Sequence, residues 1–93
     1  MTEKGLQDYL KKVALKNSVL FFKVVAVSVV GFPDVLLIHK GKTCFVELKS
    51  PKGTGKLSPR QLNLISILMY EGMDVKVIQS KEEVDALILR FTK

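Results

Sequence analysis

The 93-residue chain has few of the residues from which disulfides and several kinds of metal centre are built. Its one cysteine, Cys44, cannot form an internal disulfide, and its apolar neighbours predict a small core residue. Its one histidine, His39, is expected at the surface beside a turn, and a histidine-ligated metal centre would need more of them. The N-terminus does not resemble a signal peptide, and no apolar run approaches the length of a membrane span. These absences favour an intracellular protein.

The length and composition predict one domain that spans residues 1–93. Hydrophobic residues make up 47% of the chain, which is enough for a modest single core, and no repeat or linker is present. The net charge is +6, and the surplus lies in residues 1–60, which carry eleven Lys or Arg against four acids. A basic surface beside an acidic centre suits a polyanionic substrate. Charge alone leaves a nucleic-acid-binding protein and an ordinary basic domain equally open.

Apolar periodicity predicts helices and strands in the order α-β-β-β-α-β-α. Helices are expected over 2–16, from 58 to 72 and over 80–90, with strands at 19–27, 34–39, 43–49 and 74–79. Lys40-Gly41 suits a tight hairpin, so the second and third strands should be antiparallel. The helix from residue 58 is a crossover that lets the last strand pair in parallel with an earlier one. The fold class is therefore α/β, a mixed four-stranded sheet flanked by helices.

The segment after the third strand is basic and leads into a well-marked helix start. Ser58 is the expected cap, Pro59 the first helical residue and Gln61 the partner in a capping box. The apolar face of this helix is expected to consist of Leu62, Ile65, Leu68 and Met69. Residues 50–57 are rich in glycine and lysine and are expected to form a mobile loop. Three basic residues of the loop and helix start are expected to contact phosphates, Lys52, Lys56 and Arg60.

Three charged residues lie in otherwise apolar stretches that are typical of strands. Asp34 follows a Gly-Phe-Pro loop, and Glu47 and Lys49 alternate along the third strand, so both point to the face that carries Phe45. Burying an unpaired charge costs several kcal/mol. Two converging carboxylates repel each other, and a divalent cation such as Mg²⁺ or Mn²⁺ relieves that repulsion. We therefore expect Asp34, Glu47 and the Leu48 carbonyl to hold a metal, with Lys49 beside it.

An ordinary ion pair is the alternative. Glu47 and Lys49 could pair on a solvent-exposed sheet face, with Asp34 only capping a loop. The bare spacing of the three residues favours this alternative. Their placement on two strands joined by a hairpin favours the metal site.

Three motifs of this sequence resemble those of a known family. Gly31-Phe32-Pro33-Asp34, the Val46-Glu47-Leu48-Lys49 strand and the 56–61 segment Lys-Leu-Ser-Pro-Arg-Gln are similar to the motifs of the VRR-NUC domain, within the PD-(D/E)xK nuclease superfamily. The resemblance covers nearly the whole chain and implies a restriction-endonuclease-like core.

The resemblance also implies roles for single residues. It makes Asp34 and Glu47 the metal ligands and Lys49 the catalytic lysine. Glu3 matches the acid on the family's first helix, although the helix dipole alone would favour an acid there. Gln61 matches the family's helix glutamine, although a capping role alone would also explain it. A basic residue often precedes the Gly-x-Pro-Asp loop in the family. In this chain Val29-Val30 fill those positions, and Lys23 is the expected substitute for the nucleic-acid contact.

The predicted function is a Mg²⁺- or Mn²⁺-dependent endonuclease that cuts DNA phosphodiesters. The resemblance points to structured or branched DNA such as four-way junctions, and to a phage or plasmid gene in a bacterial cell. The alternatives are a non-catalytic DNA-binding module and a Holliday-junction resolvase of the archaeal type. A homodimer is expected, because paired nicks need two sites. Apolar surface for it is offered by 19–22, 24–27, Leu64, Ile67 and Tyr70, unless these strands are central and covered on both sides.

Overall fold

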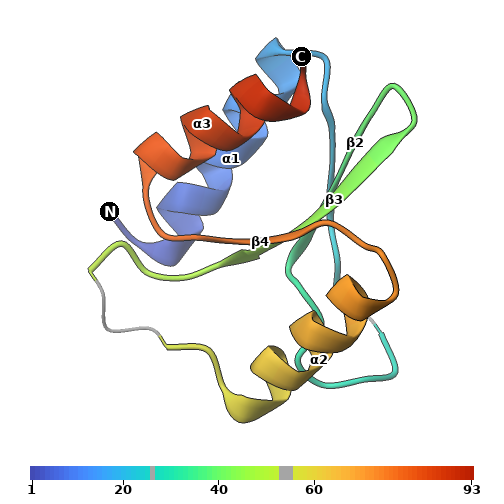
Figure 1. Cartoon of the computed structure of the whole chain (residues 1–93). Coiled ribbons are helices and arrows are strands. Elements are labelled where there is room, and N and C mark those ends of the chain that lie inside the picture. Colours follow the sequence, from blue (N-terminus) through green and yellow to red (C-terminus); the bar gives the residue numbers. More distant parts are fainter. Residues whose placement is uncertain (26, 53–55) are drawn as a thin grey trace.

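The computed structural model describes residues 1–25, 27–52 and 56–93 (Figure 1). The elements follow the predicted order, and most of their bounds lie within a residue or two of those expected. They are α1 (Glu3–Lys16), β1 (Leu20–Lys23), β2 (Val35–His39), β3 (Lys42–Leu48), α2 (Pro59–Tyr70), β4 (Val75–Ile78) and α3 (Lys81–Phe91). None of the helices in the described part of the chain is long and apolar enough to cross a membrane.

The four strands form one mixed sheet in the order β1-β2-β3-β4, which confirms the predicted fold class. β1 pairs with β2 and β2 with β3 in antiparallel fashion, whereas β4 runs parallel to β3. The β2–β3 hairpin turns at Lys40 and Gly41, whose φ angles of 49° and 81° match the expected tight turn. The sheet register therefore places the start of β2 beside the end of β3, where the charged residues lie.

Helices cover the two faces of the sheet unequally (Figure 1). α1 and α3 pack side by side over one face, and α2 lies alone on the other. Alternate residues of β2 and β3 point to the α1–α3 side and form the core with the inner faces of those helices. Fully buried members of this core include Leu6, Leu10, Val35, Leu37, Cys44, Val46 and Val84. The alternating set on β3, Phe45 and Glu47, points to the α2 side.

Local capping chemistry fixes the helix starts, and the capping box predicted at Ser58 is present. The Ser58 hydroxyl accepts a hydrogen bond from the Gln61 amide at 3.1 Å, and the Gln61 side chain accepts one from the Ser58 amide at 2.9 Å. This is a complete capping box with Pro59 in the first turn. Thr2 and Ser80 cap α1 and α3 with one side-chain bond each.

Two predicted elements differ from the structure. The first strand was expected over 19–27, but β1 ends at Lys23, because its partner β2 begins only at Val35. Just past the strand, the Val24 amide still donates a hydrogen bond to the Asp34 carbonyl oxygen at 2.8 Å. Ala26 lies outside the described residues. The predicted apolar face of α2 is also only partly inward: Ile65 is buried, whereas Leu62 and Met69 are 52% and 56% exposed. α2 packs mainly against the edge strand β4, so much of its surface extends past the sheet.

The predicted surface position of His39 is wrong as well. The residue is only 8% exposed, because strand alternation turns its side chain to the α1–α3 side. Its Nδ1 lies 3.1 Å from the Ser18 carbonyl oxygen, and its ring lies beside Phe91 with centroids 6.3 Å apart. His39 is therefore a core residue with a hydrogen-bond partner.

Candidate active site

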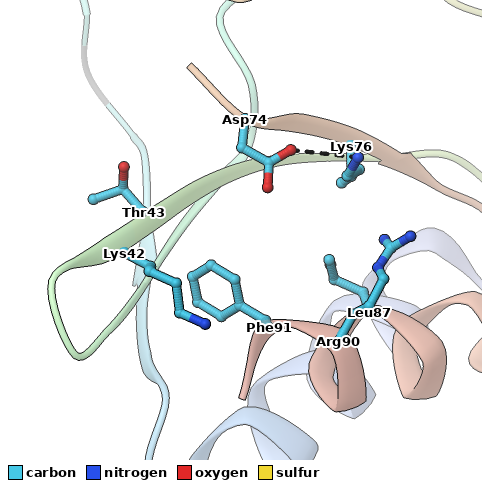
Figure 2. A pocket seen from close by; sticks show the side chains of 7 residues that line it. All are labelled: Lys42, Thr43, Asp74, Lys76, Leu87, Arg90 and Phe91. Atoms are coloured by element: carbon cyan, nitrogen blue, oxygen red, sulfur yellow. Dashed lines mark ion pairs between the residues drawn. The ribbon is translucent and has the colours of Figure 1, made fainter. Parts of the chain in front are cut away.

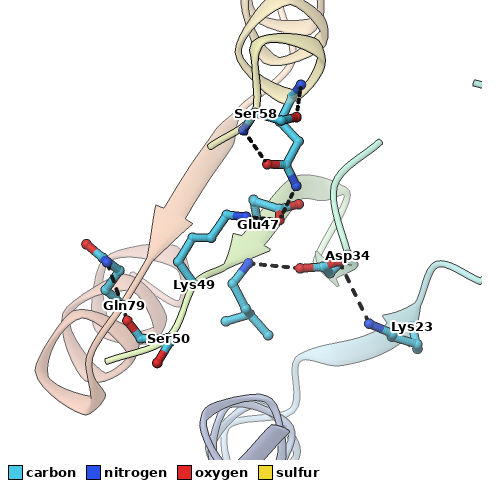
Figure 3. A network of polar contacts seen from close by, with 9 residues as sticks. Lys23, Asp34, Glu47, Lys49, Ser50, Ser58 and Gln79 are labelled. Atoms are coloured by element: carbon cyan, nitrogen blue, oxygen red, sulfur yellow. Dashed lines mark hydrogen bonds and ion pairs between the residues drawn. The ribbon is translucent and has the colours of Figure 1, made fainter. Parts of the chain in front are cut away.

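The hairpin register brings Asp34 and Glu47 together (Figure 3). Val35 pairs with Val46, so Asp34, one residue before β2, lies opposite the end of β3. The Asp34 Oδ2 accepts a hydrogen bond from the Leu48 amide at 3.1 Å, which fixes the carboxylate over the strand end. Glu47 is 2% exposed, so a carboxylate lies buried beside a second one. The alternative of a solvent-exposed ion pair is therefore wrong for Glu47.

The Glu47 carboxylate is buried without full hydrogen bonding, which is unfavourable for its charge. Its Oε1 is buried and has no hydrogen-bond partner among the described residues. The pKa of Glu47 is raised to about 7, first by burial and then by the neighbouring Asp34 charge, whereas the Lys49 charge lowers it. A divalent cation would supply the positive charge that this buried pair lacks. This donor set therefore fits a divalent metal.

Two lysines flank the carboxylate pair, one at each member (Figure 3). The Lys49 Nζ lies 3.8 Å from the Glu47 Oε2, and the Lys49 side chain is only 14% exposed. The Lys23 Nζ lies 3.9 Å from the Asp34 Oδ1 at the end of β1. Both lysines thus stand at the carboxylates, and either could also reach a phosphate bound there.

The Gln61 side chain both caps α2 and contacts the Glu47 carboxylate. Its Oε1 completes the capping box with Ser58, and its Nε2 donates a hydrogen bond to the Glu47 Oε2 at 2.9 Å. The start of α2 is therefore tied directly to the buried carboxylate. The Glu47 oxygen held in this way is the one that faces Lys49.

Gly31 lets the Gly-Phe-Pro-Asp loop pack closely against the start of α2. Its φ is +95°, and a Cβ atom on it would lie 3.1 Å from the backbone of Arg60 and Gln61. The loop therefore packs backbone to backbone against the start of α2. Phe32 holds the loop from the other side, with its ring edge-on to Phe45 at 5.2 Å. Sequence reasoning missed this role, although the glycine in the motif was the available signal.

Two other residues predicted for the site, Glu3 and the Leu48 carbonyl, are less clearly placed. In residues 1–25, 27–52 and 56–93, no group of three or more His, Cys, Asp or Glu side chains could hold a metal ion. Glu3 is exposed in the first turn of α1, and its charge is the weakest cause of the raised Glu47 pKa. The bond at Leu48 is made by its amide, and a role for its carbonyl stays a prediction. Mg²⁺ commonly keeps several waters and takes one or two carboxylates, which suits this small set.

The three residues predicted to contact phosphates lie at the surface, and their contacts stay a prediction. Lys52, Lys56 and Arg60 are all exposed, and residues 53–55 between them lie outside the described part of the chain. Arg60 is in the first turn of α2, where its backbone meets Gly31. The three side chains are therefore free to face a ligand at the loop and helix start.

Comparison with known proteins shows the family of the chain. The VRR-NUC domain family matches residues 4–82 of the sequence. The chain belongs to the VRR-NUC family. A solved structure described as a VRR_NUC domain is similar over 98% of this chain and 99% of its own, with 30% sequence identity and a TM-score of 0.83. No curated protein matches the chain. The VRR-NUC domain is a nuclease-type DNA-processing module, and its family generally uses divalent metals.

Proposed function

We propose that this VRR-NUC chain is a Mg²⁺- or Mn²⁺-dependent endonuclease that hydrolyses phosphodiester bonds of structured or branched DNA, such as four-way junctions. In this proposal residues 1–93 act as one nuclease domain, inside a bacterial or phage-infected cell. The buried Glu47 carboxylate beside Asp34 carries the proposal, because one of its oxygens has no partner among the described residues. Such a pair costs stability unless a cation binds it.

Each side chain of the site has a place in the proposed reaction. Asp34 and Glu47 would hold the cation, with the Leu48 carbonyl as a backbone ligand, and a bound cation would supply Lewis-acid activation of the scissile phosphate. Lys49 either orients or deprotonates the attacking water, or it stabilises the charge that develops on the phosphate. Gln61 keeps the Glu47 Oε2 in place through its 2.9 Å hydrogen bond. Glu3 is the acid that adds negative charge from the start of α1.

The DNA is proposed to cross the basic rim of this site. Lys23 lies at the Asp34 side, and the loop and helix start lie at the Glu47 side. Phosphate contacts there would come from Lys23, Lys52, Lys56 and Arg60. A purely DNA-binding module would not need the buried carboxylate pair, since that pair repels phosphate when no cation is present.

The protein is further proposed to act as a homodimer, because paired nicks on a junction need two sites related by a two-fold axis. β1 is an edge strand, which removes the alternative that the first strands are central and covered on both sides. On its α2-side face, Leu20 and Phe22 are 53% and 49% exposed. Ile67 and Tyr70 of α2 are exposed as well. Exposed apolar side chains that gather on one side of a protein are a common feature of interaction sites.

The apolar surface continues from α2 into the segment before the Gly-Phe-Pro-Asp loop. Val29 and Val30 are exposed and line a hollow of about 370 Å³ together with Arg60, Leu64 and Ile67. We call the surface formed by β1, 27–30 and α2 the α2-side apolar surface. Its position beside the site would bring two sites close together across the proposed two-fold axis.

Light scattering tests the dimer. The wild type should show about twice the 10.4 kDa mass of one chain at micromolar concentration. Ile67→Glu should give a monomer, whereas Leu89→Glu, on an exposed residue of α3, should not. A monomeric wild type that still makes paired cuts would show that one subunit suffices.

Incubation with linear, flapped and four-way DNA tests the activity itself. Cleavage should require Mn²⁺ or Mg²⁺, and the four-way junction should be cut most readily, by paired nicks. Asp34→Ala and Glu47→Ala should be inactive with an unchanged circular-dichroism spectrum. Binding without cleavage in every metal would instead favour the non-catalytic module.

A further inference from the structure

A second hollow lies at the opposite end of the sheet from the carboxylate pair (Figure 2). It has a volume of about 530 Å³ and opens between the starts of β3 and β4 and the last turns of α3. Because β3 runs from this hollow to the active site, Thr43 and Glu47 are separated by roughly 13 Å along the strand. The lining residues are Lys42, Thr43, Asp74, Lys76, Leu87, Arg90 and Phe91.

The rim of the hollow is basic and its floor is apolar. Leu87 and Phe91 are only 2% and 7% exposed and form the floor. The Lys42 Nζ is held 5.5 Å from the centroid of the Phe91 ring, which keeps one cation at the rim. Register places Lys76 opposite Val46, so its side chain also points to the α3 side of the sheet. The site thus combines positive charge with an apolar surface.

The negative charges around the hollow do not cancel the positive ones. Asp74 pairs with Lys76 at 3.4 Å, and the carbonyl groups at the end of α3 add a partial negative charge. Lys42 has only a long contact of 3.4 Å to the Lys93 carbonyl oxygen, and Arg90 makes no ion pair with any described residue. The Arg90 guanidinium is exposed and can give the paired hydrogen bonds that suit a phosphate.

We infer that this hollow is a second ligand site, which binds a phosphate group carried by a compound of nucleotide size. The phosphate lies among Arg90, Lys42 and Lys76, and the sugar or base covers the apolar floor. A volume of about 530 Å³ is far larger than a phosphate needs and lies in the range of small-molecule sites. The ligand is either a free nucleotide or one nucleotide of a DNA strand, and the site does not depend on the proposed nuclease activity.

Titration of the ¹⁵N-labelled protein followed by NMR tests this inference in EDTA, where no cleavage occurs. Deoxyadenosine monophosphate, inorganic phosphate and a single-stranded oligonucleotide serve as the probes. We expect saturable shifts at Thr43 and Arg90, with inorganic phosphate binding more weakly than the nucleotide. Tighter binding of the oligonucleotide at the same residues would identify a DNA strand as the source, and tighter binding of the monophosphate a free nucleotide.

Variants that each remove one positive charge, inside or outside the hollow, distinguish a specific site from general attraction of phosphate to a basic protein. Arg90→Gln, and independently Lys76→Gln, should weaken binding about tenfold or more. Lys12→Gln removes the same charge from an exposed position on α1, and Asp34→Asn changes the carboxylate pair; both should leave binding unchanged. Absence of saturable shifts at the hollow, equal weakening by Lys12→Gln, or shifts confined to the carboxylate pair would overturn the inference.

Discussion

Replacing Glu47 with glutamine should stabilise the metal-free protein while destroying its metal site. The substitution keeps the shape of the side chain and removes the charge. The Gln61 amide can still donate to the oxygen at position 47, and the new amide can donate a hydrogen bond to Asp34. The buried carboxylate loses its repulsion without leaving a cavity.

The magnitude follows from the raised pKa. A carboxyl group with a pKa of about 7 in the folded chain and 4.5 as its ordinary value binds its proton more tightly when folded. The wild type therefore loses stability as the pH rises from 4.5 to about 7. Above that window the full cost is up to about 3 kcal/mol of unfolding free energy. Below it the wild type and Glu47→Gln should be equally stable.

Urea denaturation in EDTA across pH 4 to 8.5 is the assay. The difference in unfolding free energy should be near zero at the acid end and grow through the window, which corresponds to a rise in Tm of roughly 10–20 °C at the alkaline end. Titrating groups far from position 47 cancel in the difference. Mn²⁺ at 100-fold excess over its Kd should then stabilise the wild type by about 2.7 kcal/mol and leave Glu47→Gln unchanged. A difference that is flat with pH, or a less stable variant at pH 8, would refute the reasoning.

Three further predictions concern other parts of the site. Lys49→Ala should lose about 10²–10⁴-fold in cleavage rate yet bind Mn²⁺ in calorimetry like the wild type, and loss of metal binding would reveal a structural lysine instead. Gly31→Ala should lower stability and metal affinity more than Gly72→Ala. Both glycines have φ above +90°, but only a Cβ atom at position 31 would meet backbone atoms. Equal losses of Tm in the two variants would show that the close contact of Gly31 with α2 does not matter for stability. Neutralising Lys52, Lys56 and Arg60 together should flatten the salt dependence of DNA binding by roughly one unit of slope per lost contact. An unchanged slope would place the DNA elsewhere.

Much of the fold could be predicted because its determinants are local. The Ser58 capping box, the Lys40-Gly41 turn and the alternation of β3 depend on neighbours a few residues apart. The extent of β1 depends on where β2 begins, and the exposure of α2 depends on how far the sheet extends beneath it. Neither is encoded in the segment itself, so both predictions were wrong in detail.

The features of the site also divide into local ones, which the sequence predicts, and contacts between distant segments, which it does not. Alternation and the hairpin place Glu47 and Asp34 together, and their sequence context already indicated this. The contact of Gly31 with the start of α2, and the second hydrogen bond of Gln61, join segments that are distant in sequence. A pattern within one segment cannot reveal such contacts. The buried and unpartnered Oε1 of Glu47 likewise emerges only when the surrounding elements are packed.

The rate of cleavage of an end-labelled four-way junction during a Mn²⁺ titration tests the central claim most directly. Wild-type protein should show no cleavage in EDTA and a saturable increase with Mn²⁺, whereas Asp34→Asn, folded to the same extent by circular dichroism, should remain inactive throughout. Saturable cleavage by Asp34→Asn at the wild-type rate, or wild-type cleavage that does not respond to Mn²⁺ or Mg²⁺, would contradict a metal-dependent site built on Asp34 and Glu47.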